Sequence, residues 1–360
     1  MSNLKYCIKE SIINGLSWLS KNQNNDGSFG DIYKITSTAL AIRAFKNYKD
    51  IACESRSSVR YKYDNQINLA LAYLFDNAKK NSNGIYFEED DNINMPTGAV
   101  LGAIIGLECP DYMIISDNPI LNGYTFNQLI NEIISYLIFN QNYDGGWVAV
   151  SSSYDCRYDC TTPYNRYDCT TSSSNDTSSY VIYGLCLASI NGYYIPQSLY
   201  ENLQNWVDYI QNNCGGGGDT SPCEDVNVSN TAVLIQQMYF LGYNAKNKNL
   251  NLAKQYITNN WFDPVGYFAT GWSDCQNTDY KACYEIMVAF SLYCVRSLKK
   301  SSYHKIIDWF KDITCTLLDK QKFNGSWPKS NILYDQSDSS ITTIWSILTL
   351  ENAMFYIDCY

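Results

Sequence analysis

The feature of this chain that most constrains its fold is a turn that recurs along its whole length. Each copy has an aromatic residue followed by an aliphatic one, then in most copies a Gln, and then Gly-x-aromatic. The third copy shows the full pattern, with Tyr136, Leu137, Gln141, Gly145 and Trp147. Five further copies, some without the Gln or the last aromatic residue, contain Trp18, Gln23, Gly27 and Phe29; Tyr73, Ala78, Gly84 and Tyr86; Trp206, Gln211 and Gly215; Tyr256, Trp261, Gly266 and Phe268; and Gln321, Gly325 and Trp327. Such a repeat indicates a closed or stacked array of one supersecondary unit.

The segments on the two sides of each turn differ in their hydrophobic pattern. Upstream segments, such as Lys9 to Lys21 and Phe126 to Asn140, place apolar residues at i, i+3, i+4 and i+7, which predicts an amphipathic helix with one exposed face. Downstream segments are apolar nearly all round and rich in small residues, which is typical of helices buried on every side. We expect these inner helices near residues 36–47, 97–107, 176–190, 229–241, 280–296 and 339–352.

The number of repeats fixes the expected architecture. Divided among six units, the 360 residues give about 60 residues per unit, enough for an outer helix, a turn, an inner helix and a return loop. The sequence therefore predicts an all-α fold, an (α/α)6 toroid of six helical hairpins whose inner helices line a central cavity. We expect a single domain over 1–360, with a Cys- and Tyr-rich loop insertion at about 150–174. Within this insertion the hexapeptide Arg-Tyr-Asp-Cys-Thr-Thr occurs twice, beginning at Arg157 and Arg166, as is typical of growth on a loop.

Composition narrows the classes of function. No apolar run approaches the roughly 20 residues that cross a bilayer, and the N-terminus carries no secretory apolar block, so we expect no transmembrane segment and a cytoplasmic location. The formal net charge is −10. Because nucleic-acid binding depends on a basic face, this charge argues against a nucleic-acid partner.

The repeated turn resembles the QW repeat of terpenoid cyclases and of the related prenyltransferase and squalene-cyclase proteins, and the resemblance covers essentially the whole chain. In that family the Gln bridges neighbouring helices and the aromatic residue stacks over it. The resemblance implies a toroid with a small apolar ligand, an isoprenoid, in its cavity. It also gives structural roles to Gln23, Gln141, Gln321, Trp147 and Trp327.

In class II cyclases of this family the catalytic acid is the middle Asp of Asp-x-Asp-Asp-Thr, at the start of an inner helix. The matching segment here ends in Asn175, Asp176 and Thr177. An amide stands at the acid position and only Asp176 survives, so Asp176 is the predicted acid, with a helix N-cap as its alternative role. Asp338 holds the equivalent place before the sixth inner helix and is the second candidate, with Asp335 close enough to raise its pKa by like-charge repulsion.

The loops that lead into the inner helices should all open on one face of a toroid. Polar side chains there can converge at the cavity mouth, where the positive ends of the helix dipoles also point. Two functions are compatible with this placement: a general acid in an aromatic pocket, or carboxylates that bind a metal and a diphosphate. Solvated loops and helix caps are the structural alternative. Residues expected to contact substrate are Asn175, Thr177, Tyr180, Tyr284, Glu285 and Trp345.

The resemblance to prenyltransferases raises the question of a zinc site, which in that branch is held by Asp, Cys and His. Lys281 stands where the Asp ligand should precede Cys283, and the start of the sixth inner helix, 338–343, contains no His. The single histidine, His304, falls in the predicted last outer helix, Ser301 to Leu318. We therefore expect no metal site and no cofactor, with Mg²⁺ required only for a diphosphate substrate.

Cysteines gather in the loops of the third to fifth units. Without a secretory signal and without a Cys-x-x-Cys pair, free thiols are expected, with disulfides or metal binding as alternatives. The residues are Cys156, Cys160, Cys169, Cys214, Cys223 and Cys275.

Three classes of function remain open. The first is a terpenoid cyclase-like enzyme, an isomerase or lyase that cyclises an isoprenoid by acid-initiated carbocation chemistry while aromatic rings stabilise the cations. The second is a non-catalytic toroid that binds a hydrophobic ligand or a protein partner, favoured by the degenerate Asp motif. The third is sugar chemistry with paired carboxylates. Because class II cyclases usually pair this toroid with another helical domain, a second domain or subunit supplied in trans is also an open alternative.

Overall fold

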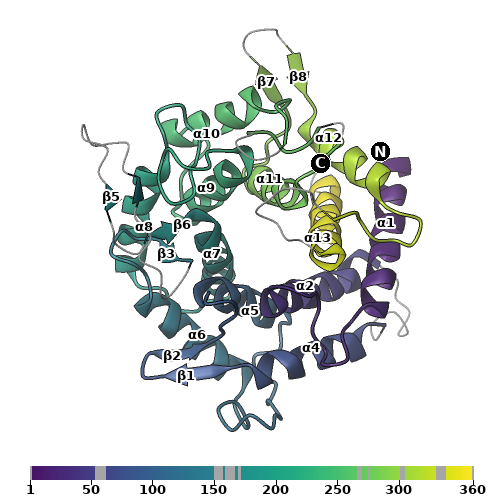
Figure 1. Ribbon diagram of the computed structural model, residues 1–360, viewed down its shortest axis with the longest axis vertical. Coiled ribbons are helices and arrows are strands. Elements are labelled where there is room, and N and C mark those ends of the chain that lie inside the picture. Colours follow the sequence, from purple (N-terminus) through teal and green to yellow (C-terminus); the bar gives the residue numbers. More distant parts are fainter. Residues whose placement is uncertain are drawn as a thin grey trace.

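A computed structural model describes residues 2–52, 62–149, 157–158, 167–168, 172–265, 270–274, 276–300, 305–329 and 338–358. The described helices form two concentric rings, an outer and an inner one (Figure 1). The outer helices are α1 (Ser2–Lys21), α4 (Asp64–Asp76), α6 (Phe126–Phe139), α8 (Gln197–Ile210), α10 (Lys248–Asn259) and α12 (Trp309–Lys320). The inner helices are α2 (Lys34–Ala52), α5 (Asn94–Gly106), α7 (Asn175–Ile190), α9 (Val228–Phe240), α11 (Tyr280–Leu292) and α13 (Ser339–Asp358). The prediction of an all-α toroid with these helices inside is confirmed.

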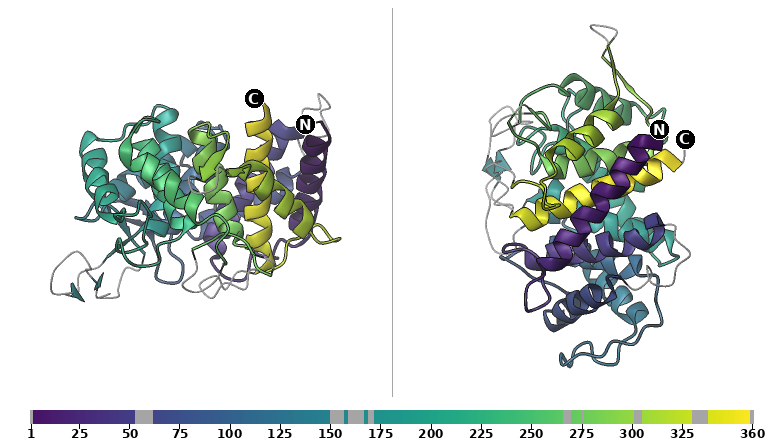
Figure 2. Two further views of the ribbon diagram at one scale, coloured as in Figure 1. Left: turned by 90° about the horizontal axis from the view of Figure 1, so that it is seen from above. Right: turned by 90° about the vertical axis from the view of Figure 1, so that its right-hand side faces the viewer.

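The inner ring is closed. Each inner helix packs against the next, in the order α2, α5, α7, α9, α11 and α13, and α13 returns to α2. Figure 2 shows α1 and α13, near the two ends of the chain, side by side where the ring closes. In α5 every residue from Asn94 to Ile105 is buried, which is the all-round burial expected of an inner helix. None of the described helices is long and apolar enough to cross a membrane.

A Gln side chain at the end of four outer helices ties each unit to the next. Its Nε2 donates one hydrogen bond to a glycine carbonyl in its own turn and another to a carbonyl of the following outer helix. The bridges are Gln23 to Gly27 and Gln66, Gln141 to Gly145 and Leu199, Gln211 to Gly215 and Asn249, and Gln321 to Gly325 and Ser11. The last bridge joins α12 to α1 and closes the outer ring.

The glycine of each turn must approach the next outer helix closely. Gly145 has φ +94°, and a Cβ added there would lie 1.8 Å from the carbonyl oxygen of Asn202. Asn202 is three residues after Leu199, the residue that Gln141 reaches. The same offset of three residues recurs where Gly27 faces Leu69, Gly215 faces Leu252 and Gly325 faces Asn14. Only glycine meets both demands, a left-handed backbone and a contact with bare backbone.

The aromatic residue of the turn fastens the inner helix to the outer one. The indole N–H groups of Trp147 and Trp327 donate to the carbonyls of Leu137 and Leu317 on the preceding outer helices. The backbone N–H of the same aromatic residue donates to a hydroxyl on the following inner helix. The pairs are Trp147 with Ser178, Trp327 with Thr343, Phe29 with Thr38, and Phe87 with Thr97. In the second unit the buried aromatic residue is therefore Phe87. The sequence pattern pointed instead to Tyr86, which lies in a short strand.

The described residues also form short antiparallel strand pairs between the helices. They join β1 (Lys79–Asn81) to β2 (Gly84–Tyr86), β3 (Trp147–Val148) to β6 (Ser173–Ser174), β4 (Arg157–Tyr158) to β5 (Tyr167–Asp168), and β7 (Leu298–Lys300) to β8 (Lys305–Ile307). The last hairpin corrects the predicted helix Ser301 to Leu318. That helix begins only at Trp309 because Asp308 caps it by accepting a hydrogen bond from the Lys311 N–H. His304 lies outside the described residues.

The inserted loop of the third unit is described only at β4 and β5. These two strands come from the two copies of the tandem hexapeptide, and they pair Arg157 with Asp168 and Tyr158 with Tyr167. Among the loop cysteines, Cys214 is a free thiol, as expected. Cys223 is disulfide-bonded to a partner outside the described residues, so the free-thiol expectation is wrong there. Cys156, Cys160, Cys169 and Cys275 also lie outside the described residues.

Replacing the turn glycine should cost more stability than its backbone conformation alone explains. Gly192 is the matched control, since its φ is +83° but a Cβ there would meet nothing within 4 Å. We expect Gly192→Ala to cost roughly 1 kcal/mol, the penalty of a left-handed Ala. Gly145→Ala should cost roughly 3 kcal/mol or more, because α6 and α8 must also separate. Urea unfolding measures both values, and equal losses would contradict this account of the turn.

Candidate functional site

The N-terminal ends of the inner helices bring most of the predicted site residues to one end of the ring. The cap of α7 is not the residue considered for that role from the sequence. Ser174, not Asp176, caps α7, because its side chain accepts the backbone N–H of Thr177 at 3.2 Å. Asn227 and Asp279 cap α9 and α11 in the same way. Asp176 is therefore free of the capping role that was its alternative.

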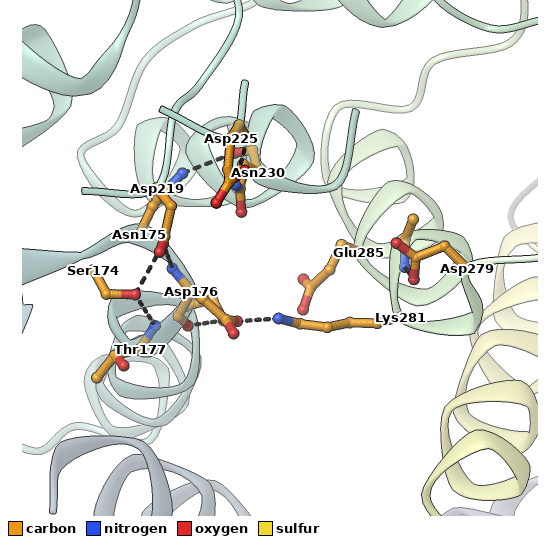
Figure 3. Close-up of polar contacts among 12 residues, drawn as sticks. Ser174, Asn175, Asp176, Thr177, Asp219, Asp225, Asn230, Asp279, Lys281 and Glu285 are labelled. Carbon is orange, nitrogen blue, oxygen red and sulfur yellow. Dashed lines mark hydrogen bonds and ion pairs between the residues drawn. The ribbon is translucent and has the colours of Figure 1, made fainter. Parts of the chain in front are cut away.

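Asp176 instead forms an ion pair with Lys281 of α11. Helices α7 and α11 are not neighbours in the ring, because α9 lies between them. Figure 3 shows the two side chains pointing toward each other across the space that the inner helices enclose. Their side chains remain 39% and 16% exposed, so this end of the ring interior is open to solvent. Burial would lower the pKa of Lys281, but Asp176, Tyr180 and Glu285 hold it well above the usual value, so the ammonium stays charged.

A second carboxyl group, Asp219, lies behind Asp176. It accepts hydrogen bonds from the Ser174 hydroxyl at 2.9 Å and from the Asp176 backbone N–H at 3.1 Å (Figure 3). Burial, together with repulsion from Asp176, raises its pKa to about 6. Asp219 and Asp176 thus form a carboxyl pair in which Asp219 binds the proton more readily than an ordinary Asp.

The polar atoms of the Asn175 side chain form hydrogen bonds within the protein. Its amide nitrogen donates to the carbonyls of Gly218 and Asn230, and its amide oxygen accepts from Gln237, all between 2.6 and 2.9 Å. The side chain is 0% exposed. It joins the start of α7 to the 217–219 loop and to α9, and these bonds use both polar atoms of its side chain. Thr177 is buried beside it, and its backbone N–H donates to the capping Ser174 hydroxyl.

Glu285 lies one helical turn after Lys281 on α11. Only 3% of it is exposed, and its carboxylate accepts a 2.6 Å hydrogen bond from the Gln236 side chain of α9. Burial raises its pKa to about 7, although Lys281 and the Gln236 bond act in the opposite direction. This carboxyl group therefore holds a proton to a higher pH than an ordinary Glu. That makes it the predicted site residue best placed to give up a proton.

Arg43 of α2 lies inside the ring and interacts electrostatically with Glu285. Its Nη2 donates to the Tyr284 hydroxyl of α11 at 2.8 Å, and its guanidinium carbon lies 3.8 Å from the centre of the Tyr183 ring of α7. Helices α2, α7 and α11 are alternate members of the ring, so the guanidinium lies on the inside of all three. Burial raises the pKa of Tyr284, so its phenol is neutral beside the cation.

The remaining predicted residues are spread around this cluster. Tyr180 lies on α7, with its ring centre 5.9 Å from the Lys281 ammonium nitrogen. Trp345 is buried on α13. Asp338 caps α13: its carboxylate accepts the backbone N–H groups of Asp31, Ser340 and Ile341 at 2.5, 2.6 and 2.9 Å. Asp335 lies outside the described residues.

The residues of this chain that match zinc-ligand positions of the prenyltransferases make other interactions. Lys281 is paired with Asp176, and burial raises the pKa of Cys283 well above that of an ordinary thiol, so the sulfur is not a thiolate. Within the described part of the chain, no three His, Cys, Asp or Glu side chains are placed to share a metal ion.

Sequence reasoning missed Arg43, Asp219 and the partnership of Lys281. Arg43 did have a signal, since it is the one charged residue within an otherwise apolar inner-helix segment, 38–45. A charge at such a position must find a partner inside the protein. Asp219 follows the glycine run 215–218 in a loop and has no comparable local signal.

Comparisons with known proteins agree with the fold. No family model matches the chain, and no curated protein does. A variant of the type II terpene cyclase MstE from Scytonema, in complex with geranylgeranyl dihydroxybenzoate, is 12% identical with a TM-score of 0.61 over 99% of both chains. An inactive α-1,6-mannanase variant from Salegentibacter, in complex with α-1,6-mannotriose, is 8% identical with a TM-score of 0.60 over 97% of this chain and 99% of that one.

The Candida albicans protein geranylgeranyltransferase-I complexed with GGPP also matches. It is 13% identical with a TM-score of 0.54, over 94% of this chain and 90% of that one. At such identities the likeness shows the fold alone. The chain thus has the α/α-toroid fold that is seen in terpene cyclases, prenyltransferases and α-mannanases.

The raised pKa of Glu285 predicts a pH-dependent stability. A folded-state pKa of about 7, above the ordinary value, means that the stabilising contribution is complete at low pH and is lost as pH rises toward and through 7. Glu285→Gln should therefore gain stability relative to the parent protein between pH 5 and pH 8, by up to roughly 3 kcal/mol. Urea unfolding at both pH values measures this change. Glu108→Gln, at an exposed position, is the control, and a gain that is the same at both pH values would contradict the assignment.

Proposed function

We propose that this protein is a terpenoid cyclase-like enzyme that binds an isoprenoid or similar apolar substrate inside the ring and cyclises it by acid-initiated carbocation chemistry. The observation that carries the proposal is a buried, protonatable carboxyl group, Glu285, facing the ring interior beside an ion pair. The fold likeness to a terpene cyclase crystallised with substrate and with product supports it.

The geometry favours Glu285 over Asp176 as the proton donor. Asp176 is engaged in an ion pair with Lys281, whereas Glu285 is buried and its pKa is raised to about 7. Asp176 then stabilises the positive charge that develops after protonation, together with the rings of Tyr180 and Tyr284. A carboxyl group with a pKa near 7 protonates an epoxide oxygen far more readily than an alkene carbon. We therefore expect an oxidised isoprenoid as the substrate.

Hydrolysis of a glycosidic bond is the second candidate function. Glycosidases use two carboxyl groups, one of them an acid with a raised pKa, and Glu285 and Asp176 are two interacting carboxyl groups of which Glu285 has a raised pKa. The fold likeness to the mannanase is as strong as the likeness to the cyclase. The third possibility, a toroid that only binds a hydrophobic ligand or a protein partner, is an outcome of the same experiment.

Turnover by single variants tests the proposal. Purified protein is incubated with linear isoprenoids, their epoxides and their diphosphates, with and without Mg²⁺, and with α-linked mannooligosaccharides; mass spectrometry identifies products. We expect isoprenoid cyclisation that Glu285→Gln lowers by at least about 100-fold, the usual share of a general acid, while Asp176→Asn lowers it less. Asp338→Asn should destabilise the protein by about 1 kcal/mol, the cost of a helix cap, and leave kcat nearly unchanged.

Other outcomes assign the function differently. Loss of activity in Asp338→Asn alone would place the acid on α13, and loss in Asp176→Asn alone would restore the acid expected from the sequence. Hydrolysis of the oligosaccharide without isoprenoid turnover would establish the second candidate. Binding without any turnover, also after addition of a partner domain or subunit, would leave the binding-only toroid.

A further inference from the structure

Within the described residues, Arg43 forms no ion pair. Arg43 is only 9% exposed, and a guanidinium offers five N–H donors. Among the residues that the structure describes, its single hydrogen bond is the one to the Tyr284 hydroxyl, and no carboxylate lies within ion-pair distance. The two carboxyl groups that act on it from further away are Glu285 of α11 and Glu351 of α13. These two are held by Gln236 and Asn47, respectively.

The unused donors of Arg43 open onto accessible space. Fully buried side-chain nitrogens without a partner do occur here, as at Trp206 Nε1 and Trp272 Nε1, but no guanidinium nitrogen of Arg43 is among them. Within the described residues, Nε and Nη1 have no hydrogen-bond partner, and each keeps some accessible surface. The Tyr183 ring covers one face of the guanidinium, so the donors that remain point from its edge. A stacked guanidinium with a free edge suits a carboxylate or a phosphate, because either can accept two parallel hydrogen bonds.

We infer that Arg43 is the binding site for the anionic head group, a carboxylate or a phosphate, of the ligand that occupies the ring interior. The inference deepens the function proposed above and depends on it for the rest of the ligand. Burial removes part of the water that would hydrate the Arg43 guanidinium. Charge-assisted hydrogen bonds to the head group would take the place of those water contacts.

The depth of Arg43 sets the orientation of the ligand. Tyr183, which covers the guanidinium, follows Asp176 by seven residues on α7 and so lies roughly 10 Å further along the helix. An anionic head group at Arg43 leaves the apolar chain to extend toward the open end, past Glu285 and Tyr180 to the Asp176–Lys281 pair. The reacting double bond or epoxide would then lie along the chain, away from the head group.

Head-group preference tests this site. Geranylgeraniol, geranylgeranoic acid and geranylgeranyl phosphate share one chain and differ only in the head group, and their Kd values are measured by titration calorimetry in detergent. We expect the parent protein to bind the acid or the phosphate at least tenfold more tightly than the alcohol, and Arg43→Met to lose this difference. The stronger of the two anions identifies the head group. Lys46→Met is the matched control, because this substitution also removes a cation from α2. Lys46 pairs with the exposed Glu108.

The other possible results of these measurements either sustain or overturn the assignment of the head group to Arg43. Equal binding of all three ligands, or an anion preference that persists in Arg43→Met, overturns the inference but leaves an isoprenoid-binding ring in place. A preference lost only in Lys281→Met moves the head group to the open end. If no isoprenoid binds, benzoate and inorganic phosphate serve as probes in thermal unfolding: stabilisation that requires Arg43 sustains the anion site without the isoprenoid, and no stabilisation rejects it. Should Arg43→Met fail to fold, Arg43→Lys, which retains the charge without the planar edge, should still weaken anion binding severalfold.

Discussion

The architecture depends on one contact between neighbouring units, the amide of a turn Gln bonded to a carbonyl of the next outer helix. Four such bridges are present, each beside a glycine whose missing side chain lets the turn lie against bare backbone. Each bridge satisfies a donor of one unit only through an acceptor of the following one. The Gln321 bridge to Ser11 spans 310 residues, so the first helix must be in place before the last turn is satisfied. Ring closure is thus part of the hydrogen bonding of the fold.

Closure of the ring also determines what the interior can hold. Side chains of the inner helices point into the ring, and some of them contact side chains on inner helices that are not their neighbours in the ring. The Asp176–Lys281 pair and the Arg43 contacts with Tyr183 and Tyr284 cross the ring in this way. An interior lined only by apolar groups would have no such contacts. Burying such charges is costly unless they are paired with one another or with a ligand.

The fold could be predicted from sequence because its signals are local. In four of the six turns a Gln and a Gly lie four residues apart, and the two helix types differ in periodicity within a single helix length. The site was predictable only in part. Asp176, Tyr284 and Glu285 were named, but their partners are distant in sequence: Lys281 is 105 residues from Asp176, and Arg43 is 241 from Tyr284. No periodicity encodes such pairs. The difference between a cap at Ser174 and one at Asp176 is likewise set by backbone geometry, since both residue types cap helices.

A fixed cation inside the ring bears directly on carbocation chemistry. At an effective dielectric constant of about 20, two unit positive charges 10 Å apart repel by roughly 2 kcal/mol, which corresponds to more than a tenfold lower rate. An uncompensated Arg43 would therefore oppose the cyclisation proposed for this ring. An anionic head group bound to Arg43 removes that repulsion and fixes the chain with its reactive part toward Glu285 and the Asp176–Lys281 pair. The electrostatics thus make the two proposals support each other: the substrate that suits this interior is one that supplies its own negative charge at Arg43 and develops positive charge away from it.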